Sequence, residues 1–198
     1  MEKLEKKWLW IGLSFTCLFL ICLYKLTNAS LWFDETVEYY YSKYPVGVVP
    51  VVDMGTKIWT NMYERIVSTF QPPLYNLVMF FWLSISTSEW WFRFFGVIMG
   101  VVCAGGIYKS IEKIWNYKIA SLSVVVLACT RQFVYYMQEC AEYNLMLAAL
   151  CWFIYGWICL MEKVTAKRIA LFCGAGIVAV YSQYGAIFPV ASFSITVF

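Results

Sequence analysis

The chain has 198 residues, of which 62% are hydrophobic and 14% are charged, and its mean hydropathy is +0.67. A soluble domain carries about 25% charged residues, and this sequence instead repeats uncharged runs long enough to cross a bilayer as helices. The composition therefore excludes a single soluble core and predicts an all-α, polytopic membrane protein. The net charge of +3 includes no basic cluster on a polar face, so no nucleic-acid partner is expected.

The inventory of reactive side chains is narrow. The chain has no histidine, and its eight cysteines form no CxxC pair, so neither a zinc site nor a disulfide framework is indicated. Proton chemistry would therefore depend on carboxylates, tyrosine or lysine. The adjacent acids Asp34 and Glu35 could hold Mg²⁺ or Mn²⁺ through oxygen ligands, but two acids are too few to predict a metal site. We expect no cofactor and leave a divalent cation open.

The first apolar run extends from Trp8 to Tyr24 without a charge and follows the basic leader MEKLEKK. A basic leader before an apolar run also begins a signal peptide. This run is long, is flanked by aromatic residues and shows no small-residue cleavage site. We therefore predict a membrane anchor whose N-terminus is cytoplasmic.

Residues 27–89 are the longest region containing polar residues and carry more acids than bases. We predict an extracytoplasmic loop with juxtamembrane helices. Within it, Leu74 to Ile85 is apolar but would extend only about 18 Å as a helix, against the roughly 30 Å of a bilayer core. If this segment crossed, Lys109 and its neighbours would face outward, against the preference of Lys and Arg for the cytoplasm. If it lies in the interface behind Pro72 and Pro73, most basic residues outside this loop collect on the cytoplasmic side, so we expect an interfacial helix.

The remaining spans are predicted at 90–108, 119–137, 144–161 and from 169 onward. The polar sequence SQYG at 182–185 indicates an outer turn, with a further span from Ala186. This makes five to six spans in a single transmembrane domain, 1–198, and we expect the chain to be truncated within the sixth. The stripe of Gly96, Gly100 and Ala104 is typical of close helix packing.

This topology gathers polar residues from distant segments on the outer side. A carboxylate can accept a proton from an attacking hydroxyl, and an arginine fork suits a departing phosphate. A more ordinary interpretation is that the acids mark the return to water, that Arg93 reaches back to the interface, and that the aromatic residues form an interfacial belt. The candidate residues are Asp34 and Glu35 for catalysis, Arg93 and Arg131 for the donor phosphate, and Gln71, Tyr75, Glu139 and Tyr143 for substrate binding.

Five segments, in this order, resemble the family 39 group of C-type membrane glycosyltransferases, which includes protein O-mannosyltransferases and lipid A aminoarabinose transferases. They are WFDE, QPPLYNLVMFFW, SEWWFRFFGVIMG, YYMQECAEYNLML and YSQYGAIF. The resemblance implies an extracytoplasmic active site in which Asp34 deprotonates or orients the acceptor, and in which Arg93 lies near the donor phosphate. It further implies a polyprenyl-phosphate sugar donor and inversion at the anomeric carbon. The partners would be this donor, membrane lipid and an acceptor that is a lipid, a glycan or a protein.

The sequence also departs from the family pattern. Gln71 and Gln183 stand where members often have histidine, and Ala141 stands where they often have arginine. Members are also longer. The alternative is therefore a catalytically incomplete or truncated relative that binds polyprenyl lipid or a partner helix without turnover. A transporter or channel is less favoured, because Arg131 is the charged residue that comes nearest to the middle of a predicted span.

Overall fold

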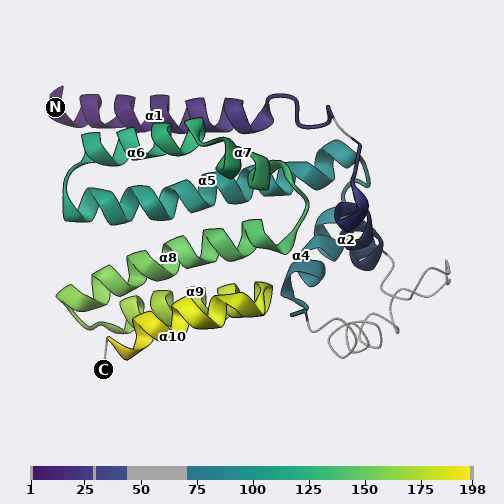
Figure 1. The fold of residues 1–198 in the computed structure, drawn as a ribbon. Coiled ribbons are helices and arrows are strands. Elements are labelled where there is room, and N and C mark those ends of the chain that lie inside the picture. Colours follow the sequence, from purple (N-terminus) through teal and green to yellow (C-terminus); the bar gives the residue numbers. More distant parts are fainter. Residues whose placement is uncertain (1, 29, 44–70, 197–198) are drawn as a thin grey trace.

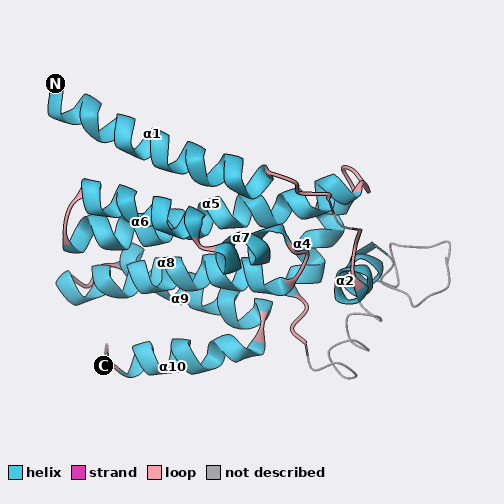
Figure 2. Ribbon diagram, turned by 45° about the horizontal axis from the view of Figure 1, so that its top comes forward, coloured by secondary structure: helices cyan, strands magenta, loops and turns pink. Residues whose placement is uncertain are grey.

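The computed structural model describes residues 2–28, 30–43 and 71–196. Every regular element in these ranges is a helix, as the composition predicts. The helices are α1 (Glu2–Leu23), α2 (Phe33–Lys43), α4 (Leu74–Leu83), α5 (Glu89–Ile114), α6 (Tyr117–Cys129), α7 (Arg131–Gln138), α8 (Glu142–Glu162), α9 (Ala166–Ser182), the short 3₁₀ helix η1 (Tyr184–Ala186) and α10 (Ile187–Ile195). The longer helices run side by side as a bundle, and α2 and α4 lie across one end of it (Figures 1 and 2).

Membrane crossing is supported by length and composition for α1, α5 and α8, and for a fourth segment if the bent pair α6–α7 counts as one span. The all-helical, multi-pass class is thereby confirmed for the described residues. The expected number of five to six spans is not confirmed. The turn predicted at 182–185 is present, because α9 ends at Ser182 and α10 begins at Ile187.

The predicted span 119–137 is not one straight helix. α6 and α7 meet at Thr130 with a bend of 71°. Thr130 has extended backbone angles, φ −80° and ψ 104°, and its hydroxyl donates to the Val126 carbonyl at 2.9 Å. The bend turns α7 away from the line of α6, and α7 packs against α5 and α1 (Figure 1).

Small residues on α5 allow this approach, as their spacing predicts. A Cβ atom on Gly96 would collide with the Met137 carbonyl oxygen, and one on Gly100 would lie 2.9 Å from the Met137 side chain. A Cβ atom on Gly106 would likewise lie 2.8 Å from the backbone of Cys151 in α8. Met137 is fully buried in the main apolar cluster, so Gly96 and Gly100 admit α7 into the core.

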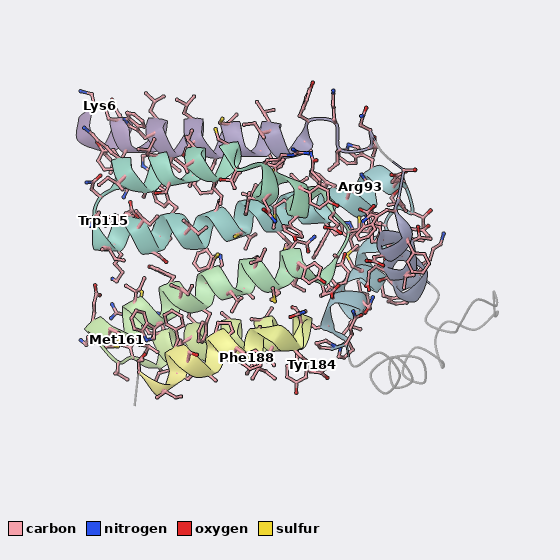
Figure 3. The ribbon with its side chains drawn as sticks, in the orientation of Figure 1. Lys6, Arg93, Trp115, Met161, Tyr184 and Phe188 are labelled. Carbon is pink, nitrogen blue, oxygen red and sulfur yellow. The ribbon has the colours of Figure 1, made fainter. Side chains whose placement is uncertain are left out.

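The two ends of the bundle differ in charge. Figure 3 shows Lys6, Trp115 and Met161 at one end and Arg93 toward the other. At the Lys6 end, Lys7 pairs with Glu112 and Lys113 pairs with Glu162, each at 2.7 Å. The gathering of basic residues at one end agrees with the predicted topology, while the side of the membrane that each end faces stays a prediction.

The segment predicted to lie in the interface forms α4, a helix of ten residues, about 15 Å long, which is too short to cross a bilayer core of roughly 30 Å. Trp82 of α4 stacks on Trp91 of α5 with ring centroids 4.3 Å apart. Each indole N–H donates to the other residue's carbonyl at 2.9 Å. α4 is therefore held against the first turn of α5. The remainder of the predicted loop, residues 44–70, lies outside the described residues.

Candidate active site

The adjacent acids of α2 lie in different environments. Asp34 is exposed, whereas Glu35 is 2% exposed. Both lie in the first helical turn, where carboxylates interact favourably with the helix dipole. Because successive helical residues point about 100° apart, at 3.6 residues per turn, the two side chains are directed toward different neighbours.

Glu35 is held by three groups, two of which come from distant parts of the chain. Its Oε2 accepts a charged hydrogen bond from Arg93 Nη2 at 2.8 Å and the Trp32 N–H at 3.2 Å. Its Oε1 accepts the Cys140 N–H at 3.0 Å. This carboxylate therefore joins α2 to α5 and to the connection between α7 and α8.

Arg93 is buried and is bonded to several groups of the protein. It is 8% exposed, and it donates from Nη1 to the Leu26 carbonyl at 2.9 Å and from Nη2 to the Ser30 carbonyl at 3.4 Å. Glu89, one turn earlier in α5, lies 3.5 Å away. Two carboxylates and two carbonyls thus surround the guanidinium, so Arg93 does not extend to the interface.

A cavity of about 790 Å³ opens beside Asp34. It is lined by carboxylates, aromatic rings and apolar side chains, and its described lining contains no Lys or Arg. The lining residues are Trp32, Asp34, Val37, Glu38, Gln71, Tyr135, Tyr136, Glu139, Ala141, Glu142, Tyr143, Met146 and Leu147. We refer to it as the acidic cavity.

A second cavity of about 380 Å³ adjoins the first, and the two share Trp32, Tyr135 and Glu139. The other lining residues of the second cavity are Lys25, Asn28, Ser30, Glu35, Arg93 and Gln138. Lys25 and Arg93 bring two cations to this lining, which also holds the carboxyl groups of Glu35 and Glu139, and the acidic cavity has no cation in its described lining. We therefore refer to the second cavity as the cationic cavity. The two cavities lie at the α2 end of the bundle.

Glu139 lies between the two cavities and is 8% exposed. Burial raises the pKa of its carboxyl above the usual value, and the negative charges of Glu35 and Asp34 raise it further. The Trp32 hydrogen bond and Arg93 act in the opposite direction. Glu139 therefore holds a proton to higher pH than an ordinary glutamate.

Glu38 is a site residue that the sequence predictions omitted. It lies one turn after Asp34 on the acidic cavity and is 6% exposed. Asn76 of α4 donates from Nδ2 to Glu38 Oε2 and to Ser42 Oγ, each at 3.0 Å, which fixes α2 on α4. The sequence contained one indication of this role, because Glu38 is four residues after Asp34 and would lie on the same face of a helix. Glu142 also lines this cavity, and no sequence signal separated it from a helix-terminal acid.

The structure brings most of the predicted residues together. Gln71, Glu139 and Tyr143 line the acidic cavity. Tyr75 is 1% exposed and is not in the lining of either cavity, and burial together with the surrounding carboxylates and Cys140 raises its hydroxyl pKa well above the usual value. Arg131 is exposed at the start of α7 and is not in the lining of either cavity.

No metal-binding cluster is found within the described residues, and no arginine is among the described residues that line the acidic cavity. No group of three or more Asp, Glu, Cys or His side chains there has an arrangement suited to a metal ion. Ala141, where the resemblance leads one to expect arginine, lines the acidic cavity. The described wall of that cavity therefore carries no cation at this position.

Residues 70–198 match the family model described as dolichyl-phosphate-mannose-protein mannosyltransferase. The chain belongs to this family. It is therefore a membrane glycosyltransferase of the C type, as the five sequence segments indicated. The match includes Arg93, Glu139 and Tyr143, whereas Asp34 and Glu35 precede it. No curated protein and no solved structure matches the chain.

Proposed function

We propose that this protein transfers a sugar from a polyprenyl-phosphate donor to a hydroxyl acceptor at the extracytoplasmic side of the membrane. The observation that carries the proposal is the pair of adjoining cavities, one with an exposed carboxylate at Asp34 and the other with two cations. An acceptor and a lipid phosphate have opposite electrostatic requirements, and this arrangement meets both within one site.

Asp34 serves as the base in this reaction. It accepts the proton of the acceptor hydroxyl, and the hydroxyl oxygen attacks the anomeric carbon. The bond from that carbon to the phosphate oxygen breaks, and the polyprenyl phosphate leaves. Attack opposite the leaving group inverts the anomeric centre. Among the two adjacent acids, Asp34 is the exposed one on the acidic cavity, which supports its assignment over Glu35.

Glu35 acts as a positioning residue rather than as a second base. Its oxygens already accept hydrogen bonds from Arg93, Trp32 and Cys140. These bonds set the rotation of α2 about its axis and thereby the direction of Asp34. Gln71, Glu139 and Tyr143 supply polar groups to the wall that faces the sugar and the acceptor. Arg131 is not in the lining of either cavity and has no part in this scheme.

The test is Asp34→Asn in the full chain, purified in detergent and assayed with a radiolabelled polyprenyl-phosphate sugar and candidate acceptors. We expect transfer to fall by about 10²–10⁴-fold, the usual contribution of a general base, with unchanged melting temperature. Glu5→Gln, at an exposed position at the opposite end of α1, is the matched control and should retain full transfer. Full transfer by the Asp34 variant would reject the assignment.

A second candidate is a relative that binds polyprenyl phosphate without turnover. It is favoured by Ala141, which leaves the acidic cavity without the arginine that the family often carries. The two candidates differ in one measurement. Saturable binding of polyprenyl phosphate by the wild-type chain, with no sugar transfer to any acceptor class, would select the second.

A further inference from the structure

We propose that Lys25 is the residue that binds the donor phosphate, and that it does so in the cationic cavity while Arg93 holds the cavity wall. This assignment rests on the proposed function for the identity of the ligand. It differs from the sequence prediction, which gave the phosphate to Arg93 and Arg131.

The terminal nitrogens of Arg93 are already bonded to protein groups. Its terminal nitrogens donate to Leu26, Ser30 and Glu35, and Glu89 lies nearby. Its Nε is buried and has no hydrogen-bond partner among the described residues. To grip a phosphate with its fork, the guanidinium would have to release Glu35, a buried carboxylate that would then lack its counter-charge. Arg93 is therefore better suited to shape the cavity than to follow a ligand that enters and leaves.

Lys25 has the opposite properties. It lies two residues after the end of α1, lines the cationic cavity and is exposed. Its ammonium lies 5.3 Å from the centre of the Tyr24 ring, and no acid pairs with it in the described parts of the chain. A lysine ammonium is a compact charge on a flexible stem, which suits a phosphate that must bind before the reaction and depart after it.

The backbone at Lys25 is held in an uncommon conformation. Among the described residues, Lys25 is the non-glycine residue with a positive φ, which is 57°. Lysine rarely occupies this region of backbone conformation. Such a conformation persists where neighbouring groups determine it. Gln138 Nε2 donates to the Tyr24 carbonyl at 2.9 Å, and Arg93 Nη1 donates to the Leu26 carbonyl at 2.9 Å. Side chains of the same cavity thus hold the carbonyls on both sides of Lys25.

The charges of the two cavities favour the same assignment. The acidic cavity is lined by Asp34, Glu38, Glu139 and Glu142, without a cation among its described residues. The cationic cavity balances Lys25 and Arg93 against Glu35 and Glu139. The raised pKa of Glu139 lowers its negative charge at a given pH, which further favours an anion on that side. Removing Lys25 would leave one cation, Arg93, against the two carboxyl groups of Glu35 and Glu139.

The experiment measures binding of farnesyl phosphate, a short polyprenyl phosphate, to the full chain in detergent by isothermal titration calorimetry. Lys25→Asn removes the charge and keeps a residue that tolerates positive φ, and Lys25→Arg keeps the charge. We expect Lys25→Asn to weaken binding by about tenfold to a hundredfold, the usual range for a charge-assisted hydrogen bond, and Lys25→Arg to remain within a few-fold of wild type. Lys118→Asn, exposed at the opposite end of the bundle, is the control and should bind as wild type.

Farnesol and inorganic phosphate separate the contributions of tail and headgroup. Weak farnesol binding that Lys25→Asn leaves unchanged would support a contact to the phosphate. Inorganic phosphate that binds as tightly as farnesyl phosphate would indicate a free-anion site and overturn the proposal. Wild-type affinity in Lys25→Asn would overturn it too, as would equal losses in Lys25→Asn and Lys25→Arg. If farnesyl phosphate binding depends on Lys25 while the wild-type chain transfers no sugar, the proposed enzymatic function fails and the Lys25 assignment stands.

Discussion

The acidic and cationic cavities have a common wall, and each is lined by one of the two adjacent acids of α2, which are held differently. In the acidic cavity, the side chain of Asp34 is exposed and free to meet a ligand. In the cationic cavity, Glu35 and Arg93 are buried and bonded to each other at 2.8 Å. Two adjacent residues of α2 therefore lie in different environments, because about 100° of helical rotation separates their side chains. One is available for chemistry, and the other fixes the helix that presents it.

The wall between the cavities explains how the two kinds of charge coexist. Trp32, Tyr135 and Glu139 belong to both linings. The tryptophan ring and the tyrosine ring are both amphipathic, and Glu139 is the carboxyl whose pKa is raised. A sugar lying against this wall would have its acceptor on one side and its phosphate on the other. The following predictions separate the two cavities experimentally.

The largest effect is expected from Asp34→Asn combined with a measurement of donor binding. Transfer should fall by about 10²–10⁴-fold through loss of the base, while farnesyl phosphate binding stays within a few-fold of wild type. A steady-state assay measures sugar transfer, and calorimetry measures farnesyl phosphate binding. A parallel loss of donor binding would show that the acidic cavity also holds the phosphate, and the distinction between the cavities would fail.

Removal of the Arg93 guanidinium should damage the scaffold of the cationic cavity. Arg93→Met leaves Glu35 buried without its counter-charge, and we expect the free energy of unfolding to fall by about 3–5 kcal/mol. The double variant Glu35→Gln/Arg93→Met should recover part of that loss, because no unpaired charge remains. Unfolding titrations with a denaturing detergent measure the free energy of unfolding of each variant. A loss in the double variant equal to the sum of the two single losses would show that the pair is not coupled.

The attachment of α2 to α4 on the acidic side should contribute less. Asn76→Ala removes the hydrogen bonds to Glu38 and Ser42, and we expect a loss of about 1–3 kcal/mol for buried polar groups that lose a partner. Ser84→Ala, at an exposed position just after α4, is the control. If transfer falls while farnesyl phosphate binding is retained, α4 supports the acidic cavity rather than the cationic one.

The smallest effect concerns the pH dependence at Glu139. Its pKa is raised in the folded chain, so the folded state binds more protons than the unfolded state between the ordinary glutamate pKa and the raised value. Stability should therefore decline as the pH rises through this window. Glu139→Gln should flatten the melting temperature across the same window. A steeper decline in the variant than in the wild type would contradict the raised pKa.

The sequence by itself determined the helical membrane class, the positions of α1, α5 and α8, the short α4 and the turn after Ser182. These features depend on the length and polarity of individual sequence segments, and each segment can be interpreted without knowledge of the others. The lengths of the predicted helices also indicated that Gln71, Glu139 and Tyr143 lie at one end of the bundle.

Tertiary structure decided which charges meet. The bend at Thr130 directs α7 into the glycine stripe of α5 and leaves Arg131 exposed. The pairing of Glu35 with Arg93 joins residues 58 positions apart, and the bond from the Cys140 N–H joins residues 105 apart. Neither the rotation of α2 nor the conformation of Lys25 follows from local propensity, because packed neighbours impose both.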